Sequence, residues 1–369
     1  MHRLVIACAF MASIFAESAL AAAPSFHVPH PVGWMHMLPV GEQPGWTDSN
    51  WFSFELSQSN IWNNEFNMTD RRNGDIYTYK ADFEQTTAVM DIGFALNPSW
   101  AFGLEIPYAN HNGGFLDDFI DQFHVFIKTV RFLRPQNDHF GNSMVIRTNG
   151  EDRLTSEHAE GVGSLKAKLK WWFAKWLSPV AGACECGMAF SLQGKFATQR
   201  RQHGLSSGAN DYSALTHIGI PIGMFSGIYA TSAVTKLGDN NTFSGWPRRE
   251  WLQMYELSLD FAFDSVIGVI AQARVESPLF MREHLLFNYT YSSDVAQANE
   301  LESSGWNSLV EWRSYQTLGL RWRYPSGSSF SAMIIEDWTL GDRNKVRKDW
   351  NYVSNAPDVG FLTQWHFVF

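Results

Sequence analysis

The chain contains few cysteines. Only three occur in 369 residues, and Cys8 lies in the N-terminal apolar stretch, so Cys184 and Cys186 are the two that remain for the body of the protein. A structural zinc site needs four ligands, and no second Cys or His pair is placed to complete one. The two cysteines therefore predict a small disulfide or two thiols at a turn. We expect no metal site and no other cofactor.

Several other features are missing as well. Gly-rich phosphate loops and zinc-protease motifs do not occur, and the net charge of −9 argues against nucleic-acid binding. After the N-terminus, no stretch has the ~18 apolar residues that a transmembrane helix needs. These absences exclude the common nucleotide-hydrolysing, zinc-protease and nucleic-acid-binding classes.

The N-terminus has the organisation of a secretory signal peptide. A short basic region at His2 and Arg3 is followed by an apolar stretch over 4–15 and an Ala-x-Ala site over 19–21. We expect residues 1–21 to be removed near Ala21 and the mature protein to be exported. Residues 22–48, rich in Pro, His and Gly, are expected to form a periplasmic leader that can tuck into the lumen of the domain that follows.

The mature chain is rich in aromatic residues, which make up 15% of the sequence and include 16 Trp. Trp and Tyr at this density suit an amphipathic boundary. Stretches of about ten residues alternate between apolar and polar side chains, which is the period of a β-strand. The clearest example places an apolar set opposite three lysines, namely Leu165, Ala167, Leu169, Trp171 and Phe173 against Lys166, Lys168 and Lys170.

Alternating strands behind a signal peptide predict an all-β fold, a transmembrane up-and-down antiparallel β-barrel of about twelve strands over residues 49–369. Only a closed sheet leaves no unpaired backbone groups in hydrocarbon. The strands are expected near 50–60, 83–96, 98–109, 160–174, 186–199, 211–222, 225–237, 250–264, 266–278, 308–323, 328–340 and 358–369. Tight turns at 97–98, 264–265 and 325–329 would face the periplasm, and the longer connections would face outward.

The final strand carries an aromatic face that ends the chain. Phe361, Trp365, Phe367 and Phe369 fall on one side of it, where we expect lipid. A terminal aromatic strand resembles the signal by which the barrel assembly machinery of Gram-negative bacteria recognises its substrates. The expected location is therefore the Gram-negative outer membrane, with outer-membrane lipid, lipopolysaccharide and the assembly machinery as partners.

One segment of the long loop 110–159 breaks the strand rhythm. Apolar residues from Leu116 to Val130 recur at helical spacing, and Asp117, Asp121, His124 and Lys128 form a stripe on the other side. The motifs "GLEIPY" and "GGFLDDFIDQFH" resemble an uncharacterised family of proteobacterial outer-membrane barrel proteins, a domain of unknown function. The resemblance implies the barrel fold and the outer-membrane location, and it brings no catalytic residues.

The expected function is a passive, porin-like channel for small polar solutes, narrowed by the loop helix folding inward into the mouth. The candidate lumen and constriction residues are Asp117, Asp121, His124, Lys128, Lys166, Lys168, Lys170, Glu105, Arg274, Arg321 and Arg323. A second interpretation is a lipid or lipid-A hydrolase that uses His124, or His203 with Ser206. A third is a structural or receptor barrel without conductance, since a charge-locked lumen would conduct nothing.

Overall fold

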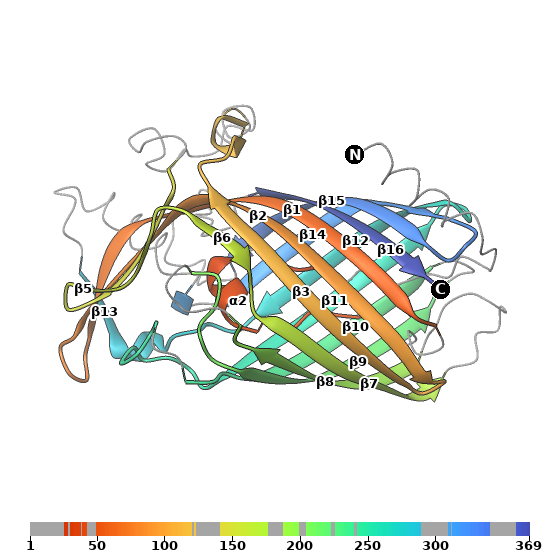
Figure 1. Cartoon of the computed structure of the whole chain (residues 1–369), viewed down its shortest axis with the longest axis horizontal. Helices are drawn as coiled ribbons and strands as arrows, with labels where there is room; N and C mark the ends of the chain where they lie inside the picture. The colour runs from red at the N-terminus through yellow and green to blue at the C-terminus, as the bar shows by residue number, and fades with distance from the viewer. Residues whose placement is uncertain are drawn as a thin grey trace, which may run out of the picture.

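The computed structural model describes the residues 26–28, 30–37, 39–42, 49–119, 122, 141–175, 187–198, 204–222, 226–239, 242–288, 309–310, 312–339 and 359–369. Twelve of its strands pair with antiparallel neighbours in a closed ring, which confirms the predicted fold (Figure 1). Around the ring they are β1 (Trp51–Asp70), β2 (Ile76–Asn97), β3 (Trp100–Asn112), β7 (Leu165–Lys175), β8 (Gly187–Phe196), β9 (Asp211–Pro221), β10 (Gly227–Lys236), β11 (Trp251–Ala262), β12 (Ile267–Glu276), β14 (Arg313–Arg323), β15 (Ser329–Thr339) and β16 (Val359–Val368).

The last strand closes the ring on the first. β16 pairs with β1 from Trp51↔Val368 to Ser59↔Gly360, and Asn50 and Phe369 exchange backbone hydrogen bonds of 3.0 and 3.1 Å. The three predicted tight turns lie at this same end of the barrel. In one of them, Asp264 Oδ1 accepts the amide protons of Val266 and Ile267, both at 2.7 Å.

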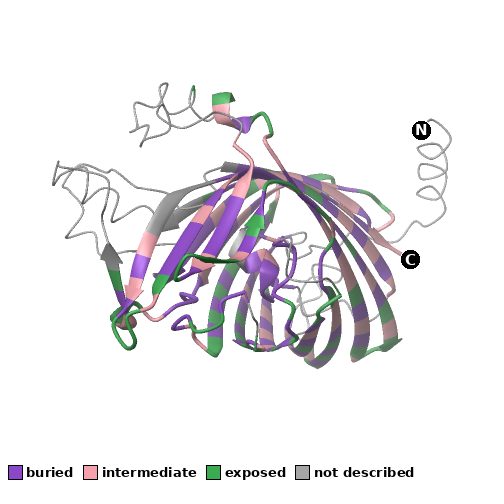
Figure 2. Cartoon of the chain, turned by 60° about the vertical axis from the view of Figure 1, so that its left-hand side comes forward, coloured by how far each residue is buried: buried purple, intermediate pink, exposed green. Residues whose placement is uncertain are grey.

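The outward face of the barrel forms an apolar belt. Side chains alternate between a buried inner row and an exposed outer row along each strand, visible as stripes in Figure 2. Aromatic side chains gather at both margins of the outer row. The pairs near the turns include Trp100–Trp171, Phe52–Phe367 and Trp322–Phe330, and the opposite margin carries Tyr212, Trp251 and Tyr255. This arrangement is typical of a barrel wall that faces lipid. Within the described ranges, no helix is long and apolar enough to cross a membrane.

Beyond the belt, at the end away from the tight turns, a second hydrophobic core covers the mouth of the barrel. It joins residues of β2, such as Tyr77, to residues at the end of β11, such as Leu252. These two strands are six steps apart in the ring of twelve, so the core spans the mouth from one side to the other. Trp246 lies at its centre, with its ring centroid 4.7 Å from that of Tyr77 and 5.1 Å from that of Phe280. We call this cluster the cap.

Three further strands were not predicted, namely β4 (Ser143–Thr148), β5 (Glu151–Ser156) and β13 (Leu285–Asn288). A short strand β6 (Ala159–Val162) lies at the start of the stretch predicted over 160–174. β4 and β5 form a hairpin through Asn149 and Gly150, whose φ angles of 53° and 80° are those of a two-residue hairpin turn. The stretches expected to be loops form strands here because their apolar side chains pack into the cap.

The connection predicted over 61–82 is also strand for most of its length. β1 and β2 run past the belt to a turn at 71–75, where Gly74 adopts a φ of 79°. The Arg72 guanidinium donates to both carboxylate oxygens of Asp70 and holds the pKa of that carboxyl below its usual value. The charged residues that suggested a polar loop therefore form one tight turn at the tip of a long hairpin.

The predicted inward-folding helix is wrong for the part that the structure describes. Residues 116–119 are helical, but the backbone N–H of Leu116 donates to Glu84, which lies on the outer row of β2. The ring of Phe119 lies 5.8 Å from that of Phe361, also on an outer row. The helix start therefore packs against the outside of the wall, where outward polar side chains at the end of the belt give it partners. Residues 120–121 and 123–130 lie outside the described residues.

Whether the belt faces lipid can be tested by introducing a charged side chain into it. Leu257 is 56% exposed and lies midway along β11, so Leu257→Lys should reduce the free energy of folding into a bilayer by about 2–4 kcal/mol. Gln253→Lys, on the same outer row near the margin, should cost about 0–1 kcal/mol. Urea titrations of refolding into vesicles measure both. Equal costs at the two positions would contradict a lipid-facing belt.

Candidate functional site in the barrel lumen

The lumen is occupied by the N-terminal leader. Phe26 packs on Ile270, Met333 and Leu362 of the inner wall, and Met35, at the end of the short helix α2 (Pro31–Met35), belongs to the cap. The chain then returns toward the turn end, where β1 begins. The described leader therefore has its first and last residues on the same side and its apex under the cap, where α2 is seen in Figure 1. The expected periplasmic leader lies in the lumen.

On the ascending side, His27 is held between two carboxylates. Its Nδ1 lies 3.3 Å from Glu55 of β1 and its Nε2 lies 3.1 Å from Glu105 of β3. Lys166 of β7 pairs with the same Glu105 at 2.6 Å. The backbone N–H of His27 also donates to Glu55, at 3.3 Å to each oxygen. Because these groups are shielded from bulk water, the contacts are stronger than they would be on the surface.

On the descending side, Glu42 meets the lysines of β7. Its carboxylate lies 2.5 Å from the Lys168 ammonium and 3.4 Å from that of Lys170. Lys168 also pairs with Asp91 of β2 at 2.8 Å. Both ammonium groups lie over the ring of Trp51, at 5.5 and 5.8 Å from its centroid, a favourable position for a cation. The leader carboxylate thus completes a cluster whose other members all belong to the wall.

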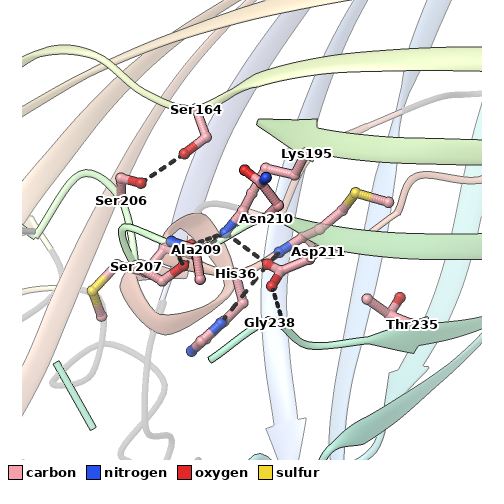
Figure 3. A network of polar contacts seen from close by, with 12 residues as sticks. His36, Ser164, Lys195, Ser206, Ser207, Ala209, Asn210, Asp211, Thr235 and Gly238 are labelled. Carbon is pink, nitrogen blue, oxygen red and sulfur yellow. Dashed lines mark hydrogen bonds and ion pairs between the residues drawn. The ribbon is translucent and has the colours of Figure 1, made fainter. Parts of the chain in front are cut away.

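At the apex, a buried ion pair holds the main chain of the leader (Figure 3). Lys195 of β8 and Asp211 of β9 lie 2.6 Å apart and are both fully buried. Lys195 donates to the carbonyl of Met35 at 2.7 Å, and Asp211 accepts the N–H of Met37 at 2.9 Å. The second Asp211 oxygen accepts the N–H of Gly238 at 2.8 Å. We call Lys195 and Asp211 the latch.

The rest of the inner wall carries further charge pairs. Arg274 of β12 lies 2.6 Å from Glu276 and 3.6 Å from Glu256, and Arg313 of β14 lies 3.1 Å from Glu276. Lower in the lumen, Arg321 and Arg323 share Asp260, the first at 2.8 Å. The interior is therefore polar, and its charges are balanced locally.

Little open space remains between the leader and the described wall. Two small cavities adjoin His27, Val40 and Lys166, and each has room for roughly one water molecule. In this state the described residues fill the lumen, with the leader in its middle and the cap above it.

The structure brings together most of the predicted lumen residues. Those on the inner wall are Glu105, Lys166, Lys168, Lys170, Arg274, Arg321 and Arg323. Asp117 is separate from them, because it accepts a 2.7 Å hydrogen bond from Asn60, an outer-row residue of β1. Asp121, His124 and Lys128 lie outside the described residues. In the last strand, Phe361, Trp365 and Phe367 line the outer row and Phe369 is 57% exposed.

The residues considered for a hydrolase do not form a catalytic group in the described part of the chain. His203 and His124 lie outside it, and the Ser206 hydroxyl contacts Ser164 at 2.7 Å. A serine–histidine contact does occur at 2.8 Å between Ser191 and His217, but the other nitrogen of His217 contacts Thr231 and all three are buried in the wall. No group of three potential metal ligands occurs among the residues described.

Sequence reasoning did not find the latch or the leader contacts. Lys195 lies in the strand predicted over 186–199, but nothing in its neighbourhood in the sequence indicates that it binds a backbone carbonyl 160 residues away. The signal available was the leader itself, which has His27, Glu42 and several apolar residues in a segment without strand or helix periodicity.

The strength of the latch can be tested with a double-mutant cycle. Asp211→Asn should weaken the hold on the leader by about 3–5 kcal/mol, because it leaves the buried Lys195 charge unpaired. Chymotrypsin cleavage within the leader, followed by mass spectrometry on the refolded protein, should then accelerate strongly. Replacing both residues, as Lys195→Met with Asp211→Leu, should cost less than the single change. Glu283→Gln, at an exposed site, is the control, and equal cleavage rates in all variants would contradict the latch.

Among solved structures, we describe three barrels that are similar to this chain. The COG4313 outer membrane channel from Pseudomonas putida F1 matches at 8% identity and a TM-score of 0.47, covering 91% of this chain and 98% of that one. A Pseudomonas aeruginosa FadL homologue matches at 8% identity and 0.38, covering 96% and 99%. The P. putida toluene transporter TodX matches at 7% identity and 0.35, also covering 96% and 99%.

Among curated proteins, none matches this sequence. A family model does match, over residues 36–304, which is well over half of the chain and includes the leader from His36 on, the latch and nine of the twelve barrel strands, from β1 to β12, in full. That family is described as "Protein of unknown function (DUF3187)", and this chain belongs to it.

Proposed function

We propose that this protein is an outer-membrane β-barrel channel for small polar solutes, closed by its own leader. The observation that carries the proposal is the chemistry of the leader's binding site. The leader is held largely by charged wall groups, including Glu55, Lys168 and the latch, so a lumen without the leader would be lined by ions and filled with water. A polar lumen of this kind supports the passage of polar solutes.

The outer-membrane location is supported by the apolar belt with its two aromatic margins. It is further supported by the closure of β16 on β1, which leaves no unpaired edge between the first and last strands. A twelve-stranded barrel lies between small barrels filled by side chains and the larger open porins. In such a lumen, a short segment is enough to close the path.

The path of the leader supports a movable closure. The described residues of the leader join no sheet, so their release breaks ion pairs and hydrogen bonds but no strand pairing. Phe26 and Glu42, the first and last of them, both lie on the turn side of the apex. The leader can therefore leave the lumen without passing through the cap and without disturbing the ring of strands.

A barrel without conductance is the second candidate, and the filled lumen is the observation that favours it. The two candidates differ in whether the leader ever leaves. Lipid hydrolysis has less support, because the described Ser191–His217 contact is buried in the wall away from lipid.

Loosening the leader should open the channel. We expect His27→Ala combined with Glu42→Ala to raise the open probability in planar bilayers well above that of the wild type, because both charged contacts of the leader are lost while the wall is unchanged. Gly41→Leu should act in the same direction, since a side chain at Gly41 would overlap the Glu256 carboxylate.

The matched control is Glu283→Gln, which lies at an exposed site outside the lumen. Discrete conductance steps in the two leader variants and rare steps in the control are the expected result. If neither leader variant conducts under any salt or voltage while heat-modifiability gels show a folded barrel, the channel proposal fails and the non-conducting barrel stands.

A further inference from the structure

The wall of the lumen binds the leader through its main chain as well as through its side chains. Glu55 accepts the N–H of His27, Asp211 accepts the N–H of Met37, and Lys195 donates to the carbonyl of Met35. The two latch residues thus hydrogen-bond to a carbonyl and an amide that lie two positions apart in the leader.

The main chain also lies close to the wall on the descending side. The backbone of Gly41 lies so near the Glu256 carboxylate of β11 that a Cβ at Gly41 would overlap that group. The N–H of Ser207 also donates to the Met35 carbonyl, at 3.2 Å. These contacts come from well-separated strands of the ring, so the main chain is bound from several sides.

The physical basis of these contacts does not depend on the leader's sequence. A buried amide without a partner is costly, so a lumen that houses a peptide must supply acceptors and donors along it. Any peptide presents the same alternation of N–H and C=O groups. Side-chain sites accompany them, since Phe26 fits among Ile270, Met333 and Leu362, and Val28 lies against Tyr315 and Ile335.

We propose that the lumen is a binding site for peptides that can form a short helical turn, and that these peptides compete with the leader for Glu55, Lys195 and Asp211. This names the solute class of the proposed channel and rests on that function for its role in transport, while the binding itself does not require conductance. Peptides fit better than sugars because the latch matches a carbonyl and an amide at peptide spacing, whereas a sugar presents hydroxyl groups.

The test uses the full mature chain carrying His27→Ala and Glu42→Ala, in detergent. A fluorescent peptide with the sequence of residues 26–42 should bind saturably by anisotropy. It should bind the wild type about tenfold or more weakly, because the leader leaves only a fraction of molecules competent. Unlabelled peptides of the same length and unrelated sequence should also displace it, at higher concentrations, because they keep the main-chain contacts and lack the side-chain contacts of His27 and Glu42. Maltohexaose should not.

Adding Asp211→Asn to that background should weaken binding by roughly tenfold or more, as expected for loss of a hydrogen bond to a charged group. Glu55→Gln should act in the same direction, and it covers the case in which the latch variant does not fold. Adding Glu283→Gln should change nothing. Unchanged affinity in a folded Asp211→Asn or Glu55→Gln variant would overturn the proposal, as would displacement by maltohexaose as effective as that by peptides.

Bilayer recordings on the same variants separate this inference from the channel function. Peptide binding without conductance means that the lumen recognises peptides and the channel proposal fails. Conductance that peptides do not block, together with absent binding, means that the channel stands and the peptide inference fails.

Discussion

A main chain inside a membrane-level lumen must find partners for its amides and carbonyls, and this requirement governs the whole molecule. The strands meet it by pairing in a closed ring. The leader does not meet it that way, because its described residues join no sheet. It relies on wall side chains instead, and the buried pair of Lys195 and Asp211 serves this need at its apex. Without such partners, each buried peptide group would cost free energy that apolar packing of a few leader side chains could not offset.

The need for buried polar groups to have partners also explains why the inner wall carries many charges and why these charges occur in pairs of opposite sign. A buried ion that loses its partner is far more costly than the pair, and the wall charges described above each have an opposite charge elsewhere on the wall or on the leader. Lys168, between Asp91 and Glu42, shows both cases. The leader is thus built into the electrostatics of the lumen, and its removal requires water to take over its contacts.

The barrel could be predicted from the sequence because its period is strong and simple. Alternation such as that of 165–173 is imposed by lipid on one side and a polar lumen on the other, so all twelve barrel strands appear in the structure close to their expected positions. The extensions of the β1–β2 hairpin and the β4–β5 hairpin were not predicted, because their apolar side chains face the cap and not lipid. Tyr77 and Ile146 alternate toward the cap, a core that exists only once distant loops have come together.

The candidate site was predictable only in part, for a related reason. A polar inner row marks Lys166, Lys168 and Arg274 as lumen residues, since the strand period places them there. Their partners depend on how the leader is threaded, and no local pattern reports that. The start of the loop helix is a second case in which the sequence predicts a burial requirement but not the place where the side chains pack. Its apolar side chains predicted burial inside the mouth, but Phe119 lies 47% exposed on the outer wall beside Phe361.

Met35 has a position that links the two ends of the molecule. It is the last residue of α2 in the leader, and it is also a member of the cap. A ligand or antibody that pulls the cap open would therefore remove packing from the leader, and departure of the leader would leave a hole in the cap. Thermodynamic linkage makes the two effects equal in free energy. A change at the cap is thus coupled to the leader at the turn end of the barrel through the Met35 side chain.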